Sequence, residues 1–217
     1  MRANGLPPLT VIKIGGSLAL SPHLRPWLDA IAAHAGVVVV PGGGPFADAV
    51  RAAQAPMGFD HSAAHRMALQ AMEQYGLALT SLHPGLALAS TRAAIAKLLA
   101  QKLAPVWAPQ NMAMRARLPA SWDLTSDSLA AWLAGTLRAQ RLVLIKHGSF
   151  AGAQSVADLA RLGIVDPLFP RYLARAQVPA WLAAPHDHDR LQADWRGARL
   201  TRIISLDALP KSVRISL

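Results

Sequence analysis

The stretch that most constrains this fold is residues 9–18, LTVIKIGGSL, a short apolar segment that ends abruptly at two glycines. An apolar run of this composition, bounded by glycine, predicts a buried strand of a sheet. Gly15 and Gly16 allow successive backbone N–H groups to point into one concavity, which suits an anion. Lys13 and Ser17 add a positive charge and a hydroxyl at the same strand end. These residues indicate half of a phosphate-binding site, although a strand that ends in Gly-Gly is more often only a tight turn.

A second strand and glycine turn follow in residues 36–45, GVVVVPGGGP. Four valines predict another buried strand, which Pro41 and three glycines terminate. Residues 46–54 then show helical spacing of apolar side chains. A strand, a glycine turn and a helix N-terminus together form a common backbone trap for anions. Neither turn fits the P-loop or the dinucleotide-binding pattern. Two such turns on neighbouring parallel strands would face each other across one cleft.

The rest of the chain alternates helices and strands. Helical patterns cover residues 24–34, 60–82 with an interruption at Gly76, 91–102, 121–140 with Thr125 or Ser126 as the cap, and 155–162. Strands are predicted at residues 103–107, 142–146 and 179–182, and a helix and one or two edge strands at the end. Residues 108–120 read as a loop with some extended structure, and a proline-rich passage contains Pro167 and Pro170. This alternation predicts an α/β fold, a three-layer α/β/α sandwich with a mainly parallel central sheet.

Composition narrows the function classes. The net charge is +10, and 17 of the 22 cationic residues are arginines scattered along the chain, so we expect anionic small substrates rather than nucleic acid as partners. The chain has no cysteine, which excludes disulfides and thiolate metal ligands. No apolar run approaches the roughly 18 residues of a membrane span, and no signal peptide is visible before the first strand. We therefore expect a cytoplasmic protein without membrane association.

Several segments resemble, in the same order, the amino acid kinase superfamily: VIKIGGS, VVVVPGGGPFADAVR, LTSDSLAAWLAG and RLVLIK. These kinases transfer the γ-phosphoryl group of ATP to a carboxylate, a carbamate or a phosphate. SWDLTSDSLAAW and AAHRMALQAMEQYG look most like a small branch that phosphorylates aminomethylfuran-methyl phosphate in methanofuran biosynthesis. The resemblance covers most of residues 9–170. It implies ATP and Mg²⁺ as cofactors, a homo-oligomer, and one domain over residues 1–217, with an acceptor-side lobe at 1–120 and a shortened nucleotide-side lobe at 121–217.

The resemblance also assigns roles to residues. It places Lys13 beside the transferred phosphoryl group and implies that Gly15, Gly16 and Ser17 bind the ATP phosphates. It also implies that Asp127 is the aspartate that orients the catalytic lysines. Phosphoryl transfer needs positioning and charge neutralisation, which lysines, amides and Mg²⁺ supply. Without the motif around it, Asp127 would be an ordinary acid in the first turn of a helix. The expected acceptor-side residues are Gly42, Gly43, Gly44, His65, Trp122, Asp123, Thr125 and Ser126.

The segment after the 142–146 strand departs from the superfamily. Many members have an acidic stretch such as DVDG there, where this chain has Lys146, His147 and Gly148. We expect these three residues on the nucleotide side, with Lys146 as the best substitute for the second catalytic lysine. The alternative for Lys146 is a surface lysine at a strand end. The alternative for the whole chain is a non-catalytic nucleotide- or oxyanion-binding protein on the same scaffold.

The acceptor we expect is a phosphate monoester, with UMP, isopentenyl phosphate or an amino-acid carboxylate as alternatives. Cations available for it are Arg51, Arg66, Arg115 and Arg117. An amino group on the acceptor would need an acid, and the acids on that side are Asp48, Asp60, Glu73 and Asp123. His61 and His65 stand one helical turn apart, but no third ligand is suggested nearby, so we assign no metal site to this chain. The HDHD run at residues 186–189 reads as a solvated loop and a helix start.

Overall fold

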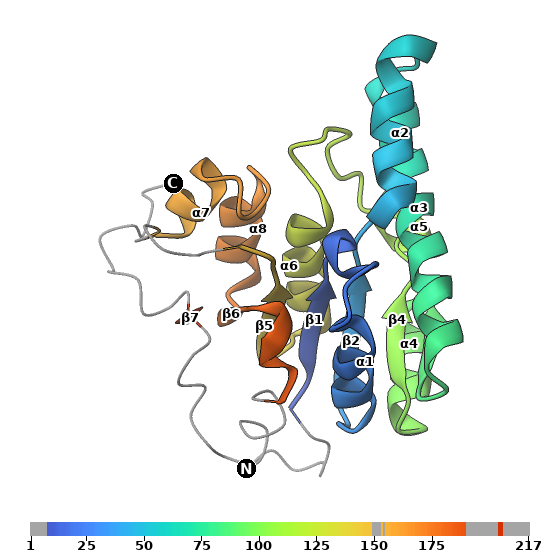
Figure 1. The fold of residues 1–217 in the computed structure, drawn as a ribbon, viewed down its shortest axis with the longest axis vertical. Helices are drawn as coiled ribbons and strands as arrows, with labels where there is room; N and C mark the ends of the chain where they lie inside the picture. Colours follow the sequence, from blue (N-terminus) through green and yellow to red (C-terminus); the bar gives the residue numbers. More distant parts are fainter. Residues whose placement is uncertain (1–7, 149–152, 154, 190–203, 206–217) are drawn as a thin grey trace.

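The computed structural model describes residues 8–148, 153, 155–189 and 204–205. Within this part of the chain, seven strands form one sheet in the order β3-β4-β2-β1-β5-β6-β7, with β1 and β2 near its middle (Figure 1). The first six strands of that order are parallel, and β7 pairs antiparallel at the edge. The strands are β1 (Thr10–Ile14), β2 (Val37–Pro41), β3 (Leu86–Ala89), β4 (Ala104–Trp107), β5 (Arg141–Ile145), β6 (Ala180–Ala183) and β7 (Ile204–Ser205).

Alternate residues of each strand point to opposite sides of the sheet, so both faces carry apolar side chains, and helices cover both. On one face Ile12 and Ile14 pack with Trp27 of α1 (Leu24–Ala32) and Leu79 of α3 (His61–Leu82). On the other face Val11 packs with apolar side chains of three helices, α4 (Arg92–Ala100), α6 (Ser126–Leu137) and α8 (Phe169–Ala176). The predicted three-layer α/β/α sandwich with a mainly parallel sheet is therefore confirmed.

The predicted helix after the second glycine turn is longer than its apolar pattern. It forms α2 (Gly44–Met57), with a proline in its first turn, where the missing N–H costs no hydrogen bond. The helix ends at Gly58, whose φ of 71° is left-handed, as is common just after a helix. The helix predicted at residues 155–162 forms α7 (Val156–Arg161). None of the described helices is long and apolar enough to cross a membrane.

The prediction of a loop over residues 108–120 was wrong in part. Residues within 108–120 form a helix, α5 (Gln110–Arg115), whose first N–H is held by the Glu73 carboxylate of α3 at 2.9 Å. The proline-rich passage contains α8, with Pro170 in the first turn, where proline is tolerated. In α5 a local pattern without helical periodicity is overridden by a contact with a residue distant in sequence.

The expected interruption at Gly76 is also absent, because α3 runs unbroken through it. A Cβ at this position would lie 3.2 Å from a Leu88 methyl carbon and 3.3 Å from one of Val106. Gly76 therefore lets α3 approach the sheet closely, a reason for a helical glycine that concerns packing and not flexibility.

The HDHD run contains the predicted helix start, with His186 and Asp189 exposed, but Asp187 is buried and not solvated as we predicted. Pro185–Asp187 forms a short 3₁₀ helix, and the buried carboxylate of Asp187 accepts a hydrogen bond from the Ala184 N–H at 2.8 Å. The indole N–H of Trp27 donates to the Pro185 carbonyl at 2.7 Å, which ties this segment to α1. The predicted C-terminal helix lies outside the described residues, whereas β7 agrees with the predicted edge strand.

Candidate functional site

The two glycine turns meet at one edge of the sheet. Ile14 and Pro41 pair as the last residues of β1 and β2, so both turns leave at the C-terminal ends of parallel strands. The Gly42 N–H donates to the Ile14 carbonyl at 2.7 Å. A Cβ on Gly16 would lie 2.5 Å from the Gly44 nitrogen, and one on Gly42 would lie 2.6 Å from the Gly16 nitrogen. Only residues without side chains allow this contact, which gathers backbone amides where an anion would bind.

Beside these turns, one carboxylate holds two lysines. The Nζ of Lys13 lies 3.0 Å from Oδ1 of Asp127, and the Nζ of Lys146 lies 2.5 Å from Oδ2. The side chains are 6%, 4% and 16% exposed for Lys13, Asp127 and Lys146 respectively. Lys13 alternates with Ile12 and Ile14 along β1, so it points to the face covered by α6, whose first turn contains Asp127. Lys146 directly follows β5, the neighbour of β1.

The charges in this cluster depend on one another. Burial alone raises the pKa of Asp127, but the positive charges of Lys13 and Lys146 outweigh it, so the pKa is lowered and the carboxylate stays ionised. Burial, together with the charge of Lys13, lowers the pKa of Lys146 to about 8, against the opposing attraction of Asp127. Asp127 cannot neutralise both lysines, which leaves positive charge available to an anion at the sheet edge.

Asp166 supports this cluster, and the sequence analysis missed it. Its buried carboxylate accepts the backbone N–H groups of Thr125 and Ser128 at 3.0 and 2.9 Å, as well as both hydroxyls. The Asp166 N–H donates to Oδ2 of Asp127 at 3.2 Å. Thr125 is the N-cap of α6 but makes no capping bond with its own side chain. Asp166 thus caps α6 from a distant part of the chain, so no local capping motif could have indicated it.

A cleft of about 500 Å³ opens in front of the two turns and the lysines. Most of the predicted site residues line it, namely Lys13, Gly15, Gly16, Ser17, Gly43, Gly44, His65, Trp122, Thr125, Ser126 and Lys146. Asp127 lies buried behind the lysines. Four further predicted residues do not line the cleft. Gly42 packs against the first turn, whereas Asp123, His147 and Gly148 are exposed outside the cleft.

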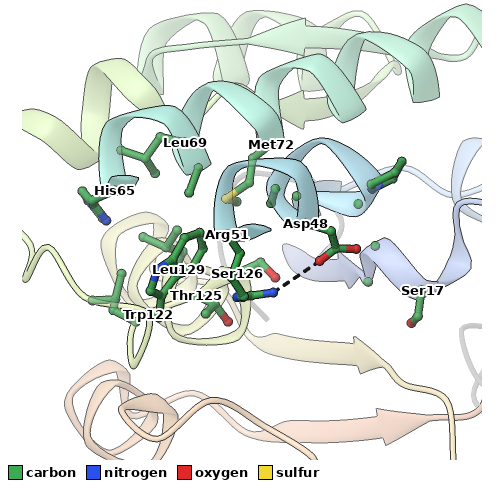
Figure 2. A pocket seen from close by; sticks show the side chains of 18 of the residues that line it. Ser17, Asp48, Arg51, His65, Leu69, Met72, Trp122, Thr125, Ser126 and Leu129 are labelled. Carbon is green, nitrogen blue, oxygen red and sulfur yellow. Dashed lines mark hydrogen bonds and ion pairs between the residues drawn. The ribbon is translucent and has the colours of Figure 1, made fainter. Parts of the chain in front are cut away.

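The far wall of the cleft combines α2 with the loop before α6. The Arg51 guanidinium lies 4.4 Å from the centroid of the Trp122 ring and 3.3 Å from Oδ1 of Asp48, and Figure 2 shows this ion pair as a dashed line. The indole N–H of Trp122 donates to Oε1 of Gln54 at 2.7 Å. Of the four arginines considered as acceptor-side cations, Arg51 lines the cleft, and the other three are not part of its wall.

The two histidines of α3 belong to the same cleft. His61 and His65 both line it, and burial lowers the pKa of His65. Among the described residues, no three histidine or acidic side chains come close enough together to hold a metal ion. The site therefore presents cations, backbone amides and imidazole groups, which suit phosphate groups, together with the Asp48 carboxylate.

Comparison with known proteins agrees with this geometry. Residues 8–148 match the family model described as "Amino acid kinase family". A curated protein of Methanocaldococcus jannaschii, named [5-(aminomethyl)furan-3-yl]methyl phosphate kinase, is 24% identical over 217 residues. The match covers 92% of this chain and 99% of that protein.

Solved structures share the fold at low sequence identity. The uridylate kinase of Archaeoglobus fulgidus is 15% identical with a TM-score of 0.65, over 87% of this chain and 96% of its own. The UMP kinase of Bacillus anthracis is 15% identical with a TM-score of 0.65, over 93% and 98%. The UMP kinase of Ureaplasma parvum is 16% identical with a TM-score of 0.61, over 82% and 90%. At these identities the likeness concerns the fold.

Proposed function

This chain belongs to the amino acid kinase family, and from that premise we propose that it transfers the γ-phosphoryl group of ATP to a phosphate monoester. One observation carries the proposal. Two lysine ammonium groups converge on the buried Asp127 carboxylate, beside the point where two glycine turns meet. Phosphoryl transfer between two anions asks a protein mainly for cations and amide donors in fixed positions. The cluster and the turns supply both.

The acceptor that we propose is [5-(aminomethyl)furan-3-yl]methyl phosphate. Support comes from the curated relative that is named as the kinase of this compound and that matches nearly the full length of this chain. A phosphate acceptor next to ATP brings like charges together, so cations beyond those for ATP are needed. Arg51, on the wall of the cleft formed by α2, is such a cation. Residues 1–120 would then serve the acceptor, and residues 121–217 the nucleotide.

The proposed step is a simple displacement. An ionised oxygen of the acceptor phosphate forms a bond to the γ-phosphorus, the bond from that phosphorus to the β,γ-bridging oxygen breaks, and its electron pair leaves on ADP. Because the attacking oxygen is already ionised, no general base is required. Lys13 would bind the transferred group, and Lys146 would hold charge that develops on the leaving ADP. Asp127 keeps both ammonium groups in place.

We further propose that Mg²⁺ accompanies ATP and that the enzyme works in the cytoplasm, where ATP is available. The ion would neutralise charge on the phosphates. The described residues offer no cluster of carboxylates for it, and both oxygens of Asp127 face lysines. This donor set fits an ion carried mainly by nucleotide phosphates and water.

A turnover assay tests the proposal. Purified protein, ATP and Mg²⁺ are incubated separately with the aminomethylfuran phosphate, UMP, isopentenyl phosphate and acetylglutamate, and ADP and phosphorus NMR spectra are followed. We expect a diphosphate product from the furan phosphate at the highest kcat/KM. Phosphorylation of acetylglutamate with every monophosphate inert would contradict a phosphate acceptor. Preference for UMP or isopentenyl phosphate would contradict the furan acceptor alone.

A further inference from the structure

We propose that Asp48 is the residue that recognises a positively charged amino group on the acceptor, so that the cleft selects phosphate monoesters that also carry a primary ammonium. The inference rests on the proposed phosphate-acceptor kinase and adds to it the feature that distinguishes this acceptor from other monophosphates. It follows from the position, partners and charge of the acids around the cleft.

Asp48 is the one acid of the described residues that lines the cleft. The other acids on the acceptor side have different tasks. Asp60 caps α3 by accepting the Ala63 N–H at 2.7 Å, and Glu73 accepts the Gln110 N–H at 2.9 Å. Asp123 is exposed outside the cleft. If the acceptor carries an ammonium group, Asp48 is the carboxylate in the described part of the cleft that can meet it.

The carboxylate of Asp48 is accessible and only partly engaged. Its side chain is 74% exposed, and Arg51 contacts Oδ1 alone, at 3.3 Å. The same Arg51 is held over the Trp122 ring, so the ion pair is fixed at the wall of the cleft (Figure 2). Asp48 lies beyond the first turn of α2, where an acid gains little from the helix dipole, so capping does not explain it.

Electrostatics gives the strongest reason for a ligand at Asp48. The cleft must take ATP and a phosphate monoester, and it presents Lys13, Lys146 and Arg51 to them. A carboxylate on the same wall repels both ligands unless one of them brings a positive charge. An acceptor with a phosphate at one end and an ammonium at the other can pair its phosphate with the cations of the cleft and its ammonium with the carboxylate. The ammonium would bind the free oxygen of Asp48, with Arg51 left on Oδ1.

The test compares two acceptors in three proteins. The acceptors are [5-(aminomethyl)furan-3-yl]methyl phosphate and (5-methylfuran-3-yl)methyl phosphate, which lacks the amino group. The proteins are the wild type, Asp48→Asn and the control Asp29→Asn. Asp29 lies on α1 outside the cleft wall. Its side chain is 68% exposed and its Oδ1 lies 3.5 Å from Nε2 of His83, so it matches Asp48 in exposure and in having one polar side-chain neighbour.

We expect the wild type to prefer the amine by about tenfold or more in kcat/KM, the size of one charge-assisted hydrogen bond. In Asp48→Asn the preference should fall close to one, through a higher KM for the amine, while the analogue reacts as well as before or better. Asp29→Asn should keep the wild-type preference. Thermal unfolding of all three proteins checks that they are folded.

The possible failures are distinguishable. A wild type that phosphorylates the furan phosphates without preference, or an Asp48→Asn variant that retains the preference, overturns the role of Asp48 and leaves the proposed function intact. A wild type that is inert with both furan phosphates overturns the proposed furan acceptor, and this inference with it.

Discussion

Lys13, Asp127 and Lys146 show how three ordinary charged residues become a site. Each lysine reaches the carboxylate from a different neighbouring strand, and burial strengthens the interactions because water screens them little. A single carboxylate between two ammonium groups fixes their positions but balances only one of their two positive charges. The cluster therefore combines structural order with reserve positive charge, which is what transfer between two anions requires.

Replacing Lys13 tests its proposed contact with the transferred phosphoryl group. We expect Lys13→Met to lower kcat by about 10²–10³, the usual effect of removing one group that stabilises charge in the transition state. Stability should change little, because methionine fills the space of the lysine stem and Asp127 keeps Lys146 at 2.5 Å. Steady-state kinetics and thermal unfolding provide the measurements, with Lys97→Met on the exposed surface of α4 as control. An unchanged kcat would remove Lys13 from the mechanism.

The depressed pKa of Lys146 predicts a pH dependence. Lys146 carries its positive charge only when protonated, and its pKa is lowered to about 8, so raising the pH above this value removes the charge. We expect kcat/KM, which reports groups of the free enzyme, to fall on the alkaline side with a midpoint near pH 8. Lys146→Arg should be slower but should lose this alkaline limb, because a guanidinium stays protonated. If the limb persists unchanged in Lys146→Arg, another group is responsible for it.

At the scale of elements, the start of α6 depends on a residue outside it. Asp166 accepts two backbone N–H groups and two hydroxyls there, whereas the N-cap residue Thr125 makes no capping bond with its own side chain. Asp127 lies in the same first turn and also receives the Asp166 N–H. The position of the cluster of Lys13, Asp127 and Lys146 is thus tied to the segment between α7 and α8.

Truncating Asp166 measures how much this support contributes. We expect Asp166→Ala to reduce the free energy of unfolding by on the order of 3 kcal/mol, since it leaves several buried donors without an acceptor. Asp60→Ala is the matched control, because Asp60 caps α3 through one N–H at an exposed helix start and should cost about 1 kcal/mol. Urea denaturation followed by circular dichroism gives both values. Equal losses in the two variants would contradict a special role for Asp166.

At the scale of the whole molecule, α2 and the adjoining end of α3 project beyond the sheet (Figure 1). These two helices expose several apolar side chains to solvent, namely Phe46, Met57, Met67 and Leu77. Their exposure leaves apolar area that association with a second chain would bury. Together with the family resemblance, it supports the proposal that the chain forms a homo-oligomer.

Light scattering coupled to size exclusion tests the proposal of an oligomer. We expect a mass that is a multiple of the 23.0 kDa chain at micromolar concentration, because burying the exposed apolar side chains of α2 and α3 favours association. Dilution to nanomolar concentration serves as the control for a reversible assembly. A mass of 23.0 kDa at every working concentration would contradict the homo-oligomer.

Local sequence was enough to predict the strands β1, β2 and β5, the two glycine turns and the helix that contains Asp127. Their signals lie within a few residues of one another, as apolar runs, glycine turns and a threonine cap. Lys13 was indicated by the strand end and glycine turn beside it, whereas Asp127 was named through the family resemblance of the segment around it. The choice of Lys146 as the partner of Asp127 came from the strand that it follows.

Only the tertiary structure decided which charged residues share the cleft and which support it. Asp166 is 39 residues from Asp127 in sequence and acts through its contacts with α6, and Glu73 holds the start of α5 from α3. The sequence does not distinguish the roles of the acids Asp48, Asp60, Glu73 and Asp123. In the structure Asp48 lines the cleft, whereas Asp60 and Glu73 hold helix starts. The physical reason is that hydrogen bonds and ion pairs are short-ranged, so a side chain's role is set by neighbours that the chain brings near only when it folds.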